Sequence, residues 1–240
     1  MLQINYSRSG TPATIAELKS DLKQIRIKVD GKVQRVFSAT ELITINSGVG
    51  IVAKAGRLQI FFAEPWRRTM QGEDALAWGT ADISTFQVEI DIDGAAVSPA
   101  LSADVNVTRQ NTPMGPIVKW RRQNVPVTAT GITNTTTLDK TNAYYKIHAF
   151  STDIDNIAVL IDQERIVESS VAGLNDYYEA NGLIPDANDT LIAFDPTMRI
   201  GDSLAMRDEA GKPVSEFRIE WDMAAANSFN IISEILGARD

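Results

Sequence analysis

The sequence contains no cysteine and a single histidine, His148. Without thiolates, the chain cannot form disulfides, thiolate zinc sites, iron–sulfur clusters or a cysteine nucleophile. One imidazole excludes clustered-histidine metal sites and leaves His148 as the sole base for a Ser-His-Asp triad. Because so few of the residue types used in catalysis are present, we predict that the protein is not an enzyme.

Long apolar runs and excess positive charge are also absent. No segment approaches 18 uninterrupted apolar residues, and the N-terminal segment lacks the basic and then apolar regions of a secretory signal. We therefore expect no transmembrane helix and a product that is soluble when made. The net charge of −8, from 23 basic and 31 acidic side chains, opposes a general affinity for nucleic acid.

The chain does have a globular composition and many short segments of alternating polarity. Its 240 residues are 44% hydrophobic, which favours a packed core over disorder. Residues 85–92 (TFQVEIDI) alternate apolar and polar side chains, a pattern typical of a β-strand. Further predicted strands are 23–30, 33–37, 58–63, 156–162, 164–167, 190–194 and 216–223. Helical signals are few: capping-box spacing at residues 38–41 and short candidate helices within 14–23 and 170–182.

The second half of the chain repeats the order of the first half. Identical residues recur at nearly constant spacings: Ile25, Asp30, Ser38 and Leu42 recur 132 positions later, Leu58 and Phe61 recur 133 positions later, and Phe86, Glu89 and Asp91 recur 131 positions later. Chance resemblance between strands does not explain why these matches keep the same order. The spacing therefore predicts two copies of one all-β domain.

A Pro- and Thr-rich stretch over residues 98–142 favours an exposed, extended connection between the two copies. We place the domains at residues 1–125, which hold the first copy and the start of the connector, and 126–240. Short strands with closely spaced turns predict two tandem antiparallel β-sandwiches of the jelly-roll type with a few short helices. Periodicity alone leaves an immunoglobulin-like sandwich open.

Six strings along the chain carry a resemblance to a known family. They are LKQIRIKVDGKVQRVFSATELI, GRLQIFFAEPWR, FQVEIDIDGAAVSPALSA, YYKIHAF, IDNIAVLIDQERIVESS and LNDYYEANG, in this order. Together with the duplication, they resemble the major capsid proteins of tailless, icosahedral, membrane-containing bacteriophages of the corticovirus kind. The resemblance covers nearly the whole chain and implies a double jelly roll. We expect no long N-terminal arm, because the predicted strands begin at Leu2.

The resemblance implies a structural protein of the virion capsid that is synthesised in the cytoplasm of a bacterial host. Three copies of a two-domain chain place six similar sandwiches around one axis, a pseudo-hexamer that tiles an icosahedral shell around an internal membrane. The expected partners are other copies of the chain, other capsid proteins and an internal membrane surface, with no specific nucleic acid. A minor capsid role in the same lineage stays open, as does a carbohydrate-binding or carbohydrate-cleaving β-sandwich.

Two basic-aromatic clusters are candidate subunit contacts. They are Trp66, Arg67 and Arg68, and Lys119, Trp120, Arg121 and Arg122. Trp and Arg are enriched among interface anchors, and Arg binds carboxylates bidentately. Ion pairs within the chain fit the same pattern, as does contact with anionic lipid headgroups. The sequence leaves these three interpretations open.

No motif predicts a complete metal or cofactor site. Asp91 and Asp93 alternate on a predicted strand and share one face, which makes them weak candidates for a structural Ca²⁺. Their spacing lacks the further acidic ligands of an EF-hand, and ordinary turn or edge chemistry is the commoner explanation for such a pair. We predict no cofactor, with calcium at this pair as the exception left open. His148 is expected to be a strand residue with ordinary hydrogen bonds.

Overall fold

The computed structural model describes residues 1–240 except residues 68, 108–111 and 208–209. It divides into two compact units, Met1–Arg121 together with Gly237–Asp240, and Arg122–Leu236. The division falls after Arg121, whereas the sequence-based boundary falls after residue 125, and the last four residues belong to the first unit. No helix among the described residues is long and apolar enough to cross a bilayer.

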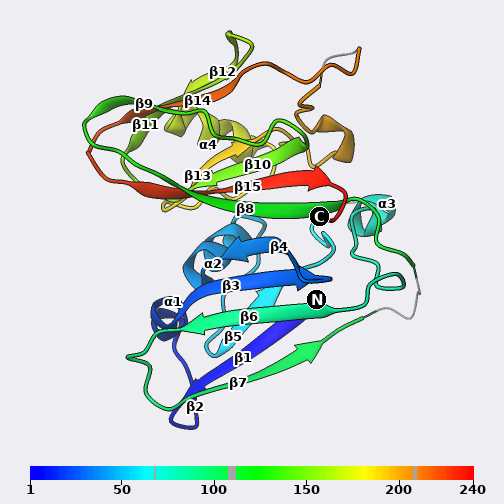
Figure 1. Cartoon of the computed structure of the whole chain (residues 1–240). Helices are drawn as coiled ribbons and strands as arrows, with labels where there is room; N and C mark the ends of the chain where they lie inside the picture. Colours follow the sequence, from blue (N-terminus) through cyan, green and yellow to red (C-terminus); the bar gives the residue numbers. More distant parts are fainter. Residues whose placement is uncertain (68, 108–111, 208–209) are drawn as a thin grey trace. The chain divides into compact units, whose positions relative to one another are not determined.

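The first unit is a sandwich of two mainly antiparallel sheets with short helices (Figure 1). Its elements are β1 (Leu2–Arg8), β2 (Thr11–Pro12), α1 (Ile15–Asp21), β3 (Leu22–Val29), β4 (Lys32–Phe37), α2 (Ala39–Gly48), β5 (Arg57–Ile60), α3 (Met70–Asp74), β6 (Phe86–Ile92) and β7 (Pro99–Val105). β1 pairs with β5 and β2 along one edge and with β7 along the other, and β3 lies between β4 and β6. Alternate residues of β1 and β3 supply its core.

The second unit contains a second sandwich. Its elements are β9 (Gly131–Thr135), β10 (Ala143–Ala149), β11 (Ile154–Ile161), β12 (Glu164–Ser170), α4 (Val171–Ala180), β13 (Thr190–Ala193), a 3₁₀ turn (Ile200–Asp202), β14 (Phe217–Met223) and β15 (Phe229–Gly237). β8 (Ile117–Val125) begins in the first unit and ends in the second. β11 pairs with β12 and β14, β14 also pairs with β9, and β15 lies between β10 and β8.

The strand pairings repeat between the units as the sequence spacing predicts. The pairing of β3 with β4 and β6 in the first unit corresponds to the pairing of β11 with β12 and β14 in the second. Likewise, the pairing of β1 with β5 and β7 corresponds to the pairing of β10 with β13 and β15. In each unit a ten-residue helix follows the second strand of this hairpin, and its N-cap is Ser38 in one unit and Ser170 in the other. Matching pairings and matching helix starts confirm the two copies of one all-β domain.

The two aspartates that the spacing makes equivalent form the same contacts. Each Oδ1 accepts two backbone N–H hydrogen bonds: Ser84 (2.7 Å) and Thr85 (2.9 Å) donate to Asp30, and Ser215 and Glu216 (both 2.8 Å) donate to Asp162. Both aspartates have a left-handed backbone, with φ of 48° and 47°. This shared turn fixes the end of one hairpin against the start of the next strand in each unit.

The second residue of this turn differs between the copies. Gly31 has φ of 79° and Gln163 has φ of 72°, a conformation that strains a residue with a Cβ atom. We predict that Gln163→Gly raises the free energy of unfolding by about 0.5 to 1 kcal/mol, since the strain relieved exceeds the entropy that glycine adds to the unfolded chain. The reverse change, Gly31→Gln, should lower it by a similar amount. Urea denaturation of both variants tests this, and a destabilised Gln163→Gly would contradict it.

The proline-rich stretch at residues 98–142 is more ordered than its composition suggests. It contains β7, β8 and β9, and most residues of β8 are buried. Pro99 is the first residue of β7, Pro113 and Pro116 precede β8, and Pro126 follows it. At these positions a missing N–H interrupts no strand pairing, so the prolines lie at or beyond the ends of the strands and do not prevent them from forming.

Candidate functional site

The first basic-aromatic cluster follows β5. Arg67 is buried, and its Nε donates to Oε2 of Glu64 at 2.5 Å. Trp66 packs edge-on against Phe61, with ring centroids 5.6 Å apart. Arg68 lies outside the described residues. Arg67 therefore forms an ion pair inside the first unit, one of the interpretations that the sequence left open. A subunit contact at this cluster stays a prediction.

The second cluster lies on β8, and its first residues bind the C-terminus. Lys119 is buried, and its Nζ donates to Oδ1 of Asp240 at 2.9 Å. Arg121 forms an ion pair with the same carboxylate and donates from Nη1 to the carbonyl of Val33 at 2.8 Å. Burial favours a higher pKa for Asp240, but hydrogen bonds and charge from Lys119 and Arg121 hold its pKa below the ordinary value. Arg122 begins the second unit and is half-buried.

Trp120, also on β8, lines an aromatic box around Arg35, a residue that the sequence patterns did not single out. The guanidinium carbon of Arg35 lies near three ring centroids, 4.8 Å from Trp78, 4.9 Å from Trp120 and 5.7 Å from Phe62. The same guanidinium donates to two backbone carbonyls, from Nε to Val118 at 3.0 Å and from Nη1 to Phe61 at 2.6 Å. Cation–π contacts are strongest when desolvated, so Arg35 fixes β4, β8 and the segment after β5 together.

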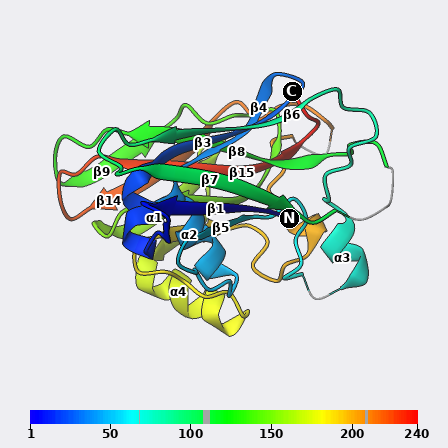
Figure 2. The same ribbon diagram turned by 90° about the horizontal axis from the view of Figure 1, so that it is seen from below.

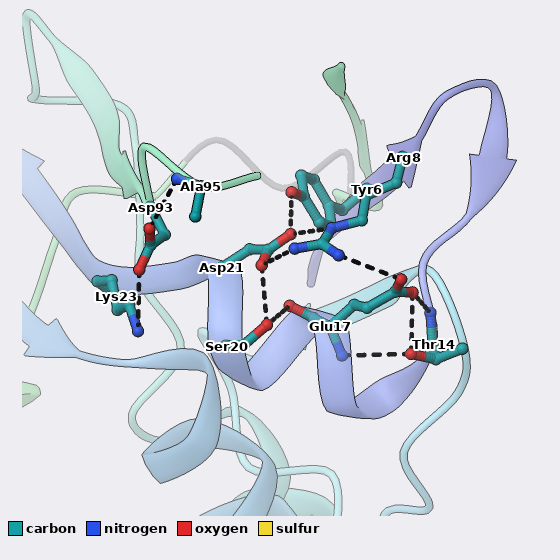
Figure 3. A network of polar contacts seen from close by, with 9 residues as sticks. All are labelled: Tyr6, Arg8, Thr14, Glu17, Ser20, Asp21, Lys23, Asp93 and Ala95. Carbon is teal, nitrogen blue, oxygen red and sulfur yellow. Dashed lines mark hydrogen bonds and ion pairs between the residues drawn. The ribbon is translucent and has the colours of Figure 1, made fainter. Parts of the chain in front are cut away.

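A buried ionic network joins β1 to α1 (Figure 3). The Asp21 carboxylate accepts hydrogen bonds from Tyr6 Oη at 2.5 Å, from Arg8 Nε at 2.6 Å and Nη2 at 2.5 Å, and from Ser20 Oγ at 2.8 Å. Burial alone would raise the pKa of Asp21, but the hydrogen bonds from Arg8, Tyr6 and Ser20 lower it to about 2. Asp21 is the last residue of α1, where the helix dipole disfavours an anion. Arg8 therefore stabilises the charged form.

We predict that Asp21→Asn lowers the stability of the first unit at pH 7 and that this loss shrinks in acid. The folded pKa of Asp21, about 2, lies below its ordinary value of 3.8. Its contribution is therefore complete above about pH 4 and disappears as the pH falls toward 2. Free energies of unfolding of the wild type and the variant, measured from pH 7 down to pH 2, should converge.

The matched control is Asp91→Asn, because Asp91 is exposed and its ion pair is screened by water. This variant should have wild-type stability throughout the pH range. If the difference between the wild type and Asp21→Asn is the same at pH 2 as at pH 7, the ionised carboxylate is not what stabilises the junction of β1 and α1.

The two candidate calcium ligands each have a cationic partner. β6 ends at Ile92, so Asp91 lies on the strand and Asp93 lies in the turn that follows. Arg26 Nη2 lies 2.6 Å from Oδ2 of Asp91, and Lys23 Nζ lies 3.1 Å from Oδ2 of Asp93 (Figure 3 for Asp93). In the described part of the chain, no group of three or more acidic or histidine side chains is arranged to hold a metal ion. Calcium at this pair stays a hypothesis.

The single histidine is buried between two carboxylates of the second unit. His148 Nδ1 lies 2.6 Å from Oδ2 of Asp189, and Nε2 lies 3.7 Å from Oε1 of Glu234. Burial lowers the pKa of His148, but the negative charge of Asp189, with a smaller effect of Glu234, outweighs burial and raises it to about 9. The imidazole is therefore a cation at neutral pH and forms ion pairs. A protonated ring has no free lone pair with which to act as a general base.

Several solved structures from viruses have the same fold. The major capsid protein P2 from bacteriophage PM2 has a TM-score of 0.85 and 21% identity, covering 100% of this chain and 87% of that chain. A structure of Sulfolobus turreted icosahedral virus has a TM-score of 0.62 and 13% identity, covering 98% of this chain and 81% of that chain. The PBCV-1 virus capsid has a TM-score of 0.61 and 9% identity, covering 98% of this chain and 85% of that chain. These similarities establish the fold, a double jelly roll.

Family comparison assigns both halves of the chain. No curated protein matches the sequence. The family model of the viral coat protein P2 N-terminal domain matches residues 2–108, and the family model of the viral coat protein P2 C-terminal domain matches residues 117–238. Because the two matches follow the two copies seen in the fold and together span nearly all of the sequence, the chain belongs to the viral coat protein P2 family.

Proposed function

We propose that this chain is the major coat subunit of an icosahedral virion and that it acts as a homotrimer. Membership of a viral coat protein family carries the proposal and places the protein in the capsid. The fold shared with the major capsid protein of bacteriophage PM2 supports the major role over a minor one.

The duplicated architecture suits a tile in a near-hexagonal lattice. Three chains around a closed three-fold axis would present six similar sandwiches, although the chains themselves have only three-fold symmetry. Each sandwich has its own core, so its sides are free to contact neighbours, first within the trimer and then between trimers. The further partners that we propose are other capsid proteins and the surface of an internal membrane.

The chemistry of the described residues supports a structural role without catalysis. The sole histidine is held as a buried cation between Asp189 and Glu234. Arg35 is likewise held by aromatic rings, and Arg67 by the carboxylate of Glu64, within the first unit. These contacts therefore stabilise the fold.

Copy number in purified particles tests the proposed function. Quantitative mass spectrometry of virions should find this chain as the most abundant protein, because a shell subunit covers the whole surface. A few copies per particle would reassign it as a minor capsid protein. A protein that stays monomeric and binds a glycan would support the carbohydrate-binding alternative instead.

A further inference from the structure

We propose that one open edge of the first sandwich is the surface on which a second copy of this chain docks. The open edge consists of the inward-facing apolar side chains of β6 and β7: Phe86, Val88, Ile90, Ile92, Leu101, Ala103 and Val105. This inference rests on the proposed function, and it names the surface through which the trimer forms.

Both strands are edge strands whose apolar faces turn toward the core. Among the described residues β6 pairs only with β3, and β7 pairs only with β1. Figure 1 shows that the turn after β6 leads into β7, and in the view from below β7 lies beside β1 at the near surface (Figure 2). Leu101 and Val105 lie opposite the buried Tyr6 and Leu2 of β1, yet they are 40% and 62% exposed. The sandwich is therefore open along this edge.

The second unit shows how this chain closes the same edge. There, the equivalent strands each have an additional neighbour, β9 beside β14 and β8 beside β15. With these neighbours in place Phe217 is 1% exposed, whereas its equivalent Phe86 is 39% exposed. Trp221 is fully buried, whereas its equivalent Ile90 is only half-buried. A polypeptide strand with apolar side chains is therefore the partner that fits such an edge.

A second observation concerns charge on the outer face of the sheet formed by β5, β1 and β7. A hollow of about 450 Å³ next to β7 is lined by Lys54 and Arg57 together with Asn5 and Ser102. Within the described residues, neither cation forms an ion pair with a carboxylate. Another copy of the chain, with its net charge of −8, supplies carboxylates to such cations. The charge as well as the apolar edge thus favours a second copy as the occupant.

Among the described residues this open edge occurs in the first unit alone, which also fits a three-fold ring. In a closed ring each copy presents two different surfaces, one to the copy before it and one to the copy after it. An uncovered apolar edge strand invites uncontrolled pairing with other chains, and a native protein covers it. Docking of the neighbouring copy on β6 and β7 supplies that cover and ends the growth of the ring at three.

The test is the mass of the double variant Leu101→Asp/Val105→Asp by analytical ultracentrifugation. Both side chains are exposed in the single chain, so the variant should keep the circular dichroism spectrum of the wild type. We expect the trimer to dissociate at least about 100-fold more readily, so that a folded monomer dominates. The matched control Val52→Asp/Ile184→Asp changes two exposed apolar residues elsewhere and should stay trimeric.

Each other outcome overturns the inference in a distinguishable way. A variant that trimerises like the wild type removes the open edge as the docking surface and leaves the proposed function intact. A wild-type protein that is monomeric at all concentrations removes the proposed function as well. If the variant stays trimeric but no longer co-sediments with phosphatidylglycerol vesicles that bind the wild type, the edge contacts lipid instead.

Hydrogen exchange gives a readout that needs no substitution. Backbone amides of β7 that point away from β1 should be protected in the wild-type trimer and should exchange rapidly once the protein is diluted to monomer, while those of β15 stay protected in both. This comparison decides the question even if the aspartate variant fails to fold. Rapid exchange of these outward-pointing β7 amides in an intact trimer would overturn the inference.

Discussion

Trp221→Ala will lower the free energy of unfolding of the second unit by about 3 to 5 kcal/mol. Trp221 is fully buried, its ring packs edge-on against Phe229 with centroids 5.5 Å apart, and its Nε1 donates to Oγ1 of Thr135 at 2.9 Å. Alanine leaves a cavity in the core and a buried hydroxyl without its donor, and both changes destabilise the fold. Urea denaturation followed by far-ultraviolet circular dichroism measures the loss.

Two controls separate the cavity from the lost hydrogen bond. Trp221→Phe keeps most of the volume and removes only the bond to Thr135, so it should cost about 1 to 2 kcal/mol. Ile132 lies on the same strand as Thr135 but is largely exposed, so Ile132→Ala should lower the free energy of unfolding by about 0.5 kcal/mol or less. A Trp221→Ala protein as stable as Ile132→Ala would contradict the central position of this ring in the core.

The second large effect is expected at Arg35. Arg35→Ala should lower the free energy of unfolding of the first unit by about 2 to 4 kcal/mol, because it removes the cation from three aromatic rings and leaves the carbonyls of Val118 and Phe61 without this donor. Arg35→Lys keeps the charge but loses the planar group that stacks and donates to both carbonyls, so it should recover only part of the loss.

The control for Arg35 is an arginine that forms only surface ion pairs. Arg26 contacts Glu89 and Asp91 on the exposed face of β3 and β6, and Arg26→Ala should cost about 0 to 1 kcal/mol. Guanidinium denaturation of the three variants gives the ranking. Full stability in Arg35→Lys would show that charge alone, without the planar geometry, accounts for the role of Arg35.

The features that the sequence predicted correctly depend on neighbouring residues. The capping box at Ser38 forms as expected, since the Glu41 N–H donates to Ser38 Oγ at 3.2 Å and the Ser38 N–H donates to Glu41 Oε2 at 2.7 Å. The alternation over residues 85–92 corresponds to β6. Strand periodicity and capping act within a few residues, so one sequence suffices to find them. The duplication was visible because it preserved such local patterns at constant spacing.

The features that the sequence did not predict depend on partners far apart along the chain. Arg35 and the carbonyl of Val118 are 83 positions apart, and His148 and Asp189 are 41 positions apart. No local pattern marks Arg35 as the centre of an aromatic box or His148 as a cation. The candidate clusters show the same limit, because the partner of Lys119 and Arg121 is the C-terminal residue Asp240. Only the fold brings these groups together.

The most direct test of the central claim is the native mass of the purified protein. A coat subunit that tiles a shell as a pseudo-hexamer should sediment as a trimer of about 79 kDa, three times the 26.3 kDa chain, with little monomer at micromolar concentration. Light scattering or native mass spectrometry decides the question. A stable 26.3 kDa monomer under all conditions would contradict the account.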